Sequence, residues 1–229
     1  MIGVYTTVHR FLVTAFALAA AQTASLKPVL DRMDASAAGF RSLTANIARV
    51  QYTAIIDDKS EDGGNVSLLK TKGKDVRALV EITRPAPRAL ALNEHKAEVF
   101  NPKANTIQEI DLGKQKGMVD QFLLLGFGVG SKELAKNYAI KYVAEEAVAG
   151  QKASKLELTP KSGDVLRHVK KIELWVSDPH GYPVQHKFIE PSGNYWLYTW
   201  SNVKLNPGLK PEQLQIKAPP NVKREYPQR

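Results

Sequence analysis

Hydrophobic and polar residues alternate with two different periods along the chain. Between residues 26 and 43 the apolar positions recur mostly every three or four residues, which predicts an amphipathic helix. From residue 44 to residue 56 the period changes to two, with Arg49, Gln51 and Thr53 on the polar face. The opposite face, which we expect to be buried in a strand, carries Ala48, Val50, Tyr52, Ala54 and Ile56.

Short apolar stretches separated by turns follow, and they predict a series of strands. The polar run 57–64 is interpreted as a solvated hairpin loop. Brief turns between the later segments predict antiparallel hairpins. The predicted strands cover residues 65–72, 75–83, 88–92, 96–100, 106–112, 140–146, 152–159, 168–176, 184–190 and 195–204.

Two segments in the middle of the chain are predicted to be helical. Residues 119–125 are strongly apolar and end at the glycine-rich segment 126–130, after which Ser131 can cap a second short helix. The tail 206–229 is rich in proline and is predicted to be extended, with one helical turn at 211–214. The predicted fold class is mainly β (α+β): one curved antiparallel sheet with helices on a single side, because an apolar sheet face needs a cover.

The first 21 residues are typical of a secretory signal peptide. Arg10 precedes an apolar run that is 11 residues long and ends at Ala21, whereas a bilayer span needs about 20 residues. Ala19 and Ala21 form an A-x-A cleavage pattern, and Ala24 offers a second cleavage site. We therefore expect a single mature domain, residues 22–229, in the periplasm. A retained membrane anchor or a buried helix is the alternative.

The 229 residues include 32 Lys and Arg against 23 Asp and Glu, which gives a net charge of +9. The basic residues are spread along the chain and are not interleaved with exposed aromatic residues, so we expect a solvated basic surface and no nucleic-acid partner. The chain contains no cysteine. This excludes a disulfide framework, a thiolate nucleophile, Cys-ligated metal and a lipid anchor on an acylated cysteine.

Motifs for catalysis and cofactor binding are weak. His180 and His186 lie near Asp178, but their spacing fits no zinc motif, and we expect both to be surface histidines. The segment 126–132 matches neither the P-loop nor the dinucleotide fingerprint, and no nucleophile elbow is present. We expect no metal, no cofactor and no enzymatic activity. A secreted hydrolase stays open as an alternative.

The apolar residues of the predicted strands allow two interpretations. They can form an ordinary core, or they can line a concave space that accepts acyl chains, where each buried CH₂ contributes about 0.8 kcal/mol. Periodicity alone does not separate the two. The candidate residues for acyl-chain binding, in the strands and in the middle helical segment, are Val50, Tyr52, Val80, Ile82, Val99, Phe122, Leu125, Phe127, Leu156, Leu158, Ile172, Leu174 and Trp196.

Several short sequence segments resemble those of the LolA-type periplasmic carriers of outer-membrane lipoproteins. The first helix ends in a Gly-Phe-Arg-Ser-Leu phrase at 39–43, and Val-Phe-Asn-Pro at 99–102 resembles the family's aromatic-then-Asn-Pro turn. Leu-Glu-Leu-Thr-Pro at 156–160 resembles its L-x-L-x-P strand end. The apolar segment 122–128 lies where the family carries its central helices, and 178–183 lies at its late hairpin.

This resemblance implies a half-open barrel whose apolar cavity is closed by a helical lid. It also implies a monomeric carrier that takes acylated lipoproteins from an inner-membrane lipoprotein-releasing complex to an outer-membrane lipoprotein receptor. In the family an arginine before a proline holds the lid, which points to Arg84, with Arg77 as a rival. The alternative function is a general lipid or glycolipid binder, or an envelope-stress sensor of the same fold.

Overall fold

The computed structural model describes residues 25–71 and 75–227. The predicted signal peptide and both of its cleavage sites therefore lie outside the described residues. None of the helices in the described ranges combines the length and apolar character that a membrane span requires.

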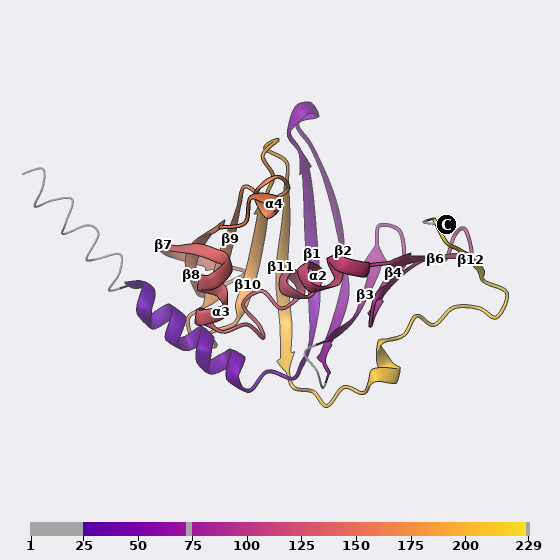
Figure 1. The fold of residues 1–229 in the computed structure, drawn as a ribbon, viewed down its shortest axis with the longest axis horizontal. Helices are drawn as coiled ribbons and strands as arrows, with labels where there is room; N and C mark the ends of the chain where they lie inside the picture. Colours follow the sequence, from indigo (N-terminus) through magenta and orange to yellow (C-terminus); the bar gives the residue numbers. More distant parts are fainter. Residues whose placement is uncertain (1–24, 72–74, 228–229) are drawn as a thin grey trace, which may run out of the picture.

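Twelve strands form one curved, unclosed sheet in the order β12-β6-β5-β4-β3-β2-β1-β11-β10-β9-β8-β7 (Figure 1). Neighbouring strands are antiparallel, except that β12 pairs in parallel with β6. This half-open barrel confirms the predicted mainly β fold. The strands are β1 (Ser42–Thr53), β2 (Asp58–Lys70), β3 (Val76–Arg84), β4 (Arg88–Asn93), β5 (Lys96–Asn101), β6 (Thr106–Asp111), β7 (Tyr138–Val148), β8 (Gln151–Pro160), β9 (Lys171–Ser177), β10 (Pro183–Ile189), β11 (Tyr195–Leu205) and β12 (Lys223–Glu225).

The N-terminal helix and the helical segment 113–137 cover the concave side of the sheet, which we call the inner face (Figure 1). The N-terminal helix spans residues 25–38 and packs Val29 and Met33, four residues apart, against the inner face. It was predicted to reach residue 43, but the chain turns at Gly39 and enters β1 at Ser42. The other helical segments are η1 (Ala54–Ile56), η2 (Gly113–Gln115), α2 (Lys116–Leu123), α3 (Ser131–Asn137), α4 (Gly163–Leu166) and η3 (Pro211–Leu214).

The buried face of β1 is opposite to the predicted one. Leu43, Ala45 and Ile47 are buried in the core, so the odd-numbered residues of this strand point to the inner face. Val50 and Tyr52 consequently lie on the outer face, where Val50 pairs with Leu197 of β11. The prediction failed because apolar residues occupy both faces of β1, in different halves of the strand.

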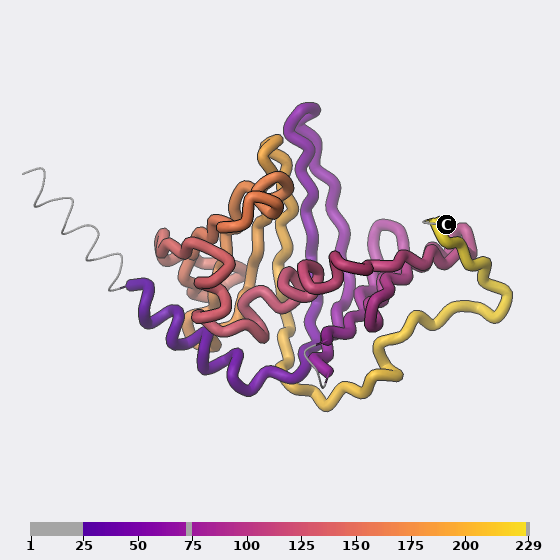
Figure 2. The backbone as a smooth tube through the Cα atoms, viewed as in Figure 1, coloured from indigo at the N-terminus to yellow at the C-terminus, as the bar shows by residue number. Residues whose placement is uncertain are grey.

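The polar run 57–64 was predicted to be a loop but belongs largely to a strand. β1 and β2 pair continuously from Ser42 opposite Leu69 to Thr53 opposite Asp58. The reversal is confined to η1 and Asp57, whose φ of 48° closes the turn. The resulting hairpin projects beyond the other strands (Figures 1 and 2).

The C-terminal tail crosses the outer face of the sheet on its way to the β6 edge (Figure 2). The helical turn predicted at 211–214 is present as η3, and its Leu214 is buried with Leu79 and Ala91. The tail ends in β12, which was not predicted and which covers the edge strand β6. The short helix α4 was not predicted either.

Candidate functional site

The segment 113–137, which comprises η2, α2, the glycine-rich connection and α3, lies across the inner face, and we call it the lid (Figure 1). Leu124, Leu125 and Phe127 of the lid are buried. The Phe127 ring contacts four aromatic rings, and the shortest of these contacts is an edge-to-face packing on Trp200 with 5.1 Å between centroids. The lid is therefore fastened to the sheet mainly by apolar and aromatic contact.

One buried histidine joins the lid to the sheet by hydrogen bonds. His186 Nδ1 accepts a hydrogen bond from Trp200 Nε1 at 2.8 Å, so the ring proton is on Nε2, which donates to the Leu125 carbonyl at 2.9 Å. Burial lowers the pKa of His186 to about 4, and the bond to Leu125 opposes this shift. The prediction that His186 is a surface residue was wrong, since it is only 3% exposed.

Two carboxylates supply further polar contacts of the lid. Asp34 of the N-terminal helix accepts hydrogen bonds from the Ser131 backbone N–H at 2.5 Å and from the Ser131 hydroxyl at 2.6 Å, and so holds the start of α3. Within α2, the buried Lys116 ammonium donates to both oxygens of Asp120 at 2.5 Å. Burial raises the pKa of the Asp120 carboxyl, and Lys116 opposes this shift.

A glycine sets how closely the lid approaches the sheet. Gly126 has a φ of 77°, a conformation that favours glycine, and a Cβ at this position would lie 2.5 Å from Pro183 Cγ. The lid can follow this path only with glycine at position 126.

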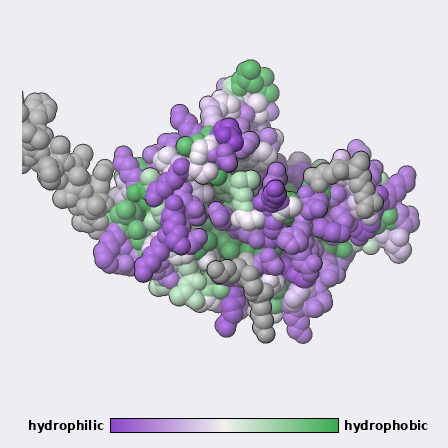
Figure 3. All heavy atoms as spheres, viewed as in Figure 1, coloured by the Kyte–Doolittle hydropathy of each residue, from purple (hydrophilic) through white to green (hydrophobic). Residues whose placement is uncertain are grey.

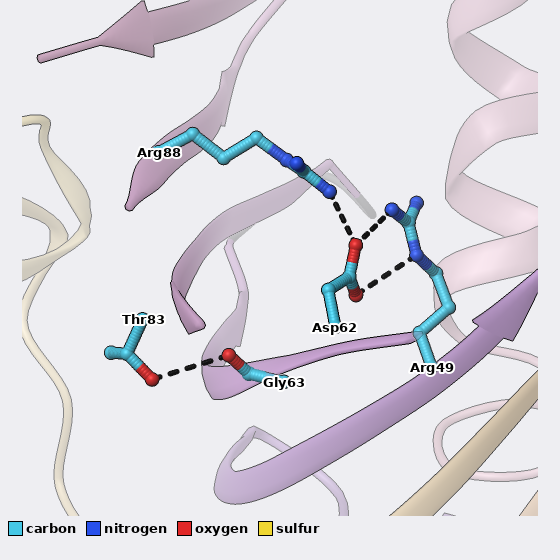
Figure 4. A network of polar contacts seen from close by, with 5 residues as sticks. All are labelled: Arg49, Asp62, Gly63, Thr83 and Arg88. Carbon is cyan, nitrogen blue, oxygen red and sulfur yellow. Dashed lines mark hydrogen bonds and ion pairs between the residues drawn. The ribbon is translucent and has the colours of Figure 1, made fainter. Parts of the chain in front are cut away.

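A cluster of charged residues links β1, β2 and β4 (Figure 4). It lies on the inner face, because Arg49 has the same strand parity as Ile47 and pairs with Asp62. Asp62 of β2 forms ion pairs with Arg49 of β1 and Arg88 of β4, and Arg49 Nε also donates to Asp62 at 3.0 Å. The Arg49 guanidinium stacks on Trp196, 4.9 Å from the ring centroid. We call Arg49, Asp62 and Arg88 the arginine cluster; with two guanidinium groups and one carboxylate it carries an excess positive charge.

Arg88 also lines a groove of about 720 Å³ beside the arginine cluster. Its wall combines apolar residues such as Val99 and Phe100 with polar residues such as Gln108, so it suits an amphipathic molecule. Val99, one of the predicted acyl-binding residues, lines it from β5. The other lining residues are Ala86, Pro87, Phe100, Asn101, Pro102, Lys103, Ala104, Thr106, Gln108 and Glu225.

The structure brings most of the predicted acyl-binding residues together on the inner face or the lid. Leu156, Leu158, Ile172 and Leu174 are fully buried in one cluster with Leu125 of the lid, and Phe122 packs against this cluster. Phe127 and Val80 belong to a second cluster. Ile82 and Trp196 are half-buried. Strand alternation places Ile82 on the same inner face as Val80, and Trp196 on the same inner face as Trp200. Val50 and Tyr52 are the exceptions, because they lie on the outer face.

The two predicted lid-holding arginines make their contacts away from the lid. Arg77 pairs with Glu94, 3.3 Å away in the β4–β5 turn. Arg84 lies against Gly63, and its Nε is 3.0 Å from where a Cβ of that residue would be. In residues 25–71 and 75–227, no hydrogen bond or ion pair connects either arginine to the lid.

Sequence reasoning missed His186, Asp34 and the arginine cluster. The sequence held a weak signal that His186 is buried. His186 and the apolar Phe188 are two residues apart in a strand, so their side chains point to the same face. No signal existed for Asp62, which stands in a run of polar residues. The part of the chain that the structure describes contains no group of three or more His, Cys, Asp or Glu residues suited to hold a metal ion.

No protein-family model and no curated protein sequence matches the chain. Solved structures match its fold. An uncharacterized conserved protein from Thermus thermophilus aligns with a TM-score of 0.55 and 14% identity, over 88% of this chain and 99% of that one. MucB aligns with a TM-score of 0.53 and 17% identity over 85% of this chain; the chain spans only 64% of MucB.

A LolA superfamily protein from Nitrosomonas europaea aligns at 18% identity with a TM-score of 0.38, over 83% of this chain and 97% of that chain, a similarity too low to carry an argument. Identities this low show the fold alone. The chain has the half-open barrel that the resemblance to the LolA-type carriers implies.

Proposed function

We propose that this protein is a periplasmic carrier that holds the acyl chains of lipoproteins between the lid and the inner face. The lid is the observation that carries the proposal. It covers apolar residues with apolar residues, while only a few hydrogen bonds, among them those of His186 and Asp34, fix its position. Such a lid can exchange its own contacts for those of a cargo.

The energies favour this exchange. A neutral hydrogen bond contributes about 0.5–1.5 kcal/mol net. An acyl chain of about ten methylenes contributes about 8 kcal/mol when it leaves water. A cargo chain therefore compensates for the loss of the Leu125–His186 and Ser131–Asp34 hydrogen bonds, on the condition that Leu125 and Phe127 pack against the chain and stay out of water. In this mechanism the chain replaces Phe127 and Leu125 against the inner face, and the groove beside Val99 takes the part of the cargo that extends from the lid.

The carrier then works without covalent chemistry. Its cargo comes from an inner-membrane lipoprotein-releasing complex and is passed to an outer-membrane receptor. The apolar surface is hidden when the carrier is empty and is used only when the lid opens. This population shift requires that the cargo binds the open state better than the closed state.

A second candidate is a carrier of anionic lipids, and the arginine cluster favours it. Asp62 neutralises only one of the two guanidinium groups of Arg49 and Arg88. The surplus charge suits a phosphate or carboxylate head group beside the groove. The acylated terminus of a lipoprotein does not require a positively charged partner of this kind.

Native mass spectrometry of protein purified from the periplasm, followed by organic extraction, tests both candidates. A bound acylated peptide supports the lipoprotein carrier, and a bound anionic lipid supports the second candidate. A Phe122→Asp variant should lose the bound species, whereas Val143→Asp, a change on the exposed strand β7, should retain it. Empty protein that takes up neither a synthetic triacylated lipopeptide nor an anionic phospholipid contradicts both.

A further inference from the structure

The β1–β2 hairpin, which projects beyond the other strands (Figure 1), ends in apolar residues. Ile55 and Ile56, in the turn of the β1–β2 hairpin, are 92% and 68% exposed, the highest values among the large hydrophobic residues of the described chain. The space-filling view shows this hydrophobic cap at the end of the projecting hairpin (Figure 3). We call Ile55 and Ile56 the hairpin tip. The exposure of two adjacent aliphatic side chains to water is unfavourable, so we expect another molecule to cover them.

The hairpin tip is held in one conformation. The Tyr52 hydroxyl donates to Asp57 at 2.9 Å, and the Asp57 backbone N–H donates to the Ala54 carbonyl at 3.3 Å. The Ala54 N–H donates to the Asn194 side chain of the neighbouring β10–β11 turn at 2.9 Å. The isoleucines are therefore presented on a braced turn, and little conformational entropy is lost when they are covered.

Behind the tip, side chains follow the order of a membrane interface. Tyr52, three residues before Ile55, pairs with Tyr195 of β11, and the two rings stack with 4.8 Å between centroids. Lys59 lies over the Tyr52 ring at 5.9 Å, and Lys187 lies over the Tyr195 ring at 4.1 Å. Aliphatic residues at the end, tyrosines next and lysines around them match the polarity gradient from acyl chains to head groups.

We propose that the hairpin tip inserts into the surface of a lipid bilayer with zwitterionic head groups. Two isoleucines on a convex point are too few for a stable protein interface, which needs about 1,000 Å² or more of buried area. A fluid lipid surface can close around such a point. Three carboxylates, those of Asp57, Asp58 and Glu61, stand near the tip and oppose an anionic surface. The proposal concerns where the protein meets a membrane and does not depend on its cargo.

A single introduced cysteine tests this contact, because the chain has no cysteine of its own. Ile55→Cys labelled with the fluorophore NBD is mixed with vesicles of phosphatidylethanolamine and phosphatidylcholine at about 0.5 M salt, which screens the basic surface. We expect a blue shift of the emission and flotation with the vesicles. The matched control is Val143→Cys on β7, which is 44% exposed and should keep its emission wavelength. Unchanged emission at position 55, or an equal shift at both positions, overturns the proposal.

A second variant removes the apolar tip without a label. The Ile55→Ser/Ile56→Ser double variant should float with these vesicles at least tenfold less than the wild-type protein, whereas Val143→Ser should float equally well. Uptake of a soluble acyl probe should be the same in all three proteins, which separates this proposal from the carrier function. Equal flotation of the double variant and the wild-type protein would show that the tip is not the membrane contact.

Discussion

His186 and Leu125 are joined by a 2.9 Å hydrogen bond from the ring Nε2 to the lid carbonyl, and the other ring nitrogen is occupied by Trp200. The ring can keep both bonds only while it is neutral, because a proton on Nδ1 would face the Trp200 N–H donor. The position of the lid is thus linked to the protonation state of one buried side chain.

This link predicts a pH dependence of stability. The pKa of His186 is about 4 in the folded protein, below its ordinary value of 6.5, because the ring is buried. The unfolded chain therefore binds more protons between these values, so stability falls as the pH drops from 6.5 through 4, by about 3 kcal/mol in total. Urea unfolding at a series of pH values measures this loss. His186→Gln, which cannot titrate, should flatten the curve in this window; parallel curves for the two proteins would contradict the role of the ring.

Removing the cap on α3 should loosen the lid. Asp34→Ala deletes both hydrogen bonds to Ser131, so we expect faster uptake of a fluorescent acyl probe and a stability loss of about 1 kcal/mol. Asp31→Ala is the matched control, since Asp31 lies on the same helix and pairs only with the exposed Lys27. Stopped-flow fluorescence gives the rates. An equal effect of both changes would mean that the α3 cap does not hold the lid.

The close approach of the lid to the sheet at Gly126 can be tested by comparison with Gly113, where an added Cβ would have no other atom within 4 Å. Both Gly126 and Gly113 have positive φ, but only a Cβ on Gly126 would meet the sheet, at Pro183. Gly113→Ala should cost about 1 kcal/mol from backbone strain, and Gly126→Ala about 3 kcal/mol because the lid must also shift. Thermal unfolding and limited proteolysis of the lid report the two effects. Similar losses for both variants would place the lid farther from β10 than the structure has it.

The arginine cluster predicts an unequal effect of two charge removals. Asp62→Asn leaves Arg49 and Arg88 without their shared carboxylate, whose side chain is only 7% exposed, and should cost about 2 kcal/mol. Glu94→Gln removes the carboxylate that pairs with Arg77 at the surface and should change stability by less than about 0.5 kcal/mol. Denaturant titration compares them. If the second candidate function holds, Asp62→Asn should also raise the affinity for an anionic amphiphile; a lowered affinity would count against that candidate.

The elements that sequence reasoning placed well depend on local signals. The helical turn at 211–214 follows from its proline, and α3 lies after the glycine-rich segment as predicted. The prediction that Ser131 caps this helix was wrong, because Gly130 is the N-cap residue and the Ser131 hydroxyl donates to Asp34. The face of β1 was not predictable in the same way. Apolar residues occupy its odd positions near Leu43 and its even positions near Val50, so alternation alone supports either face. Only the pairing of Ile47 with the buried Trp200 decides it.

The polar contacts of the candidate site could not be predicted because their partners are far apart in the sequence. His186 lies 61 residues from Leu125, and Arg88 lies 26 residues from Asp62. Strand register brings these groups together, and a shift of one residue would turn every one of these side chains to the other face. The positions of the apolar residues were less sensitive to register, because Leu156, Leu158, Ile172 and Leu174 of β8 and β9 all belong to one apolar cluster.

Photo-cross-linking shows whether acyl chains bind between the lid and the inner face. A synthetic triacylated lipopeptide with a photoactivatable group near the end of one acyl chain is bound, irradiated and mapped by peptide mass spectrometry. We expect cross-links to the lid around residues 122–127 and to inner-face residues such as Val80 or Leu174. Cross-links confined to outer-face residues such as Val50 and Tyr52, or none with a lipopeptide that is demonstrably bound, would contradict this mode of binding.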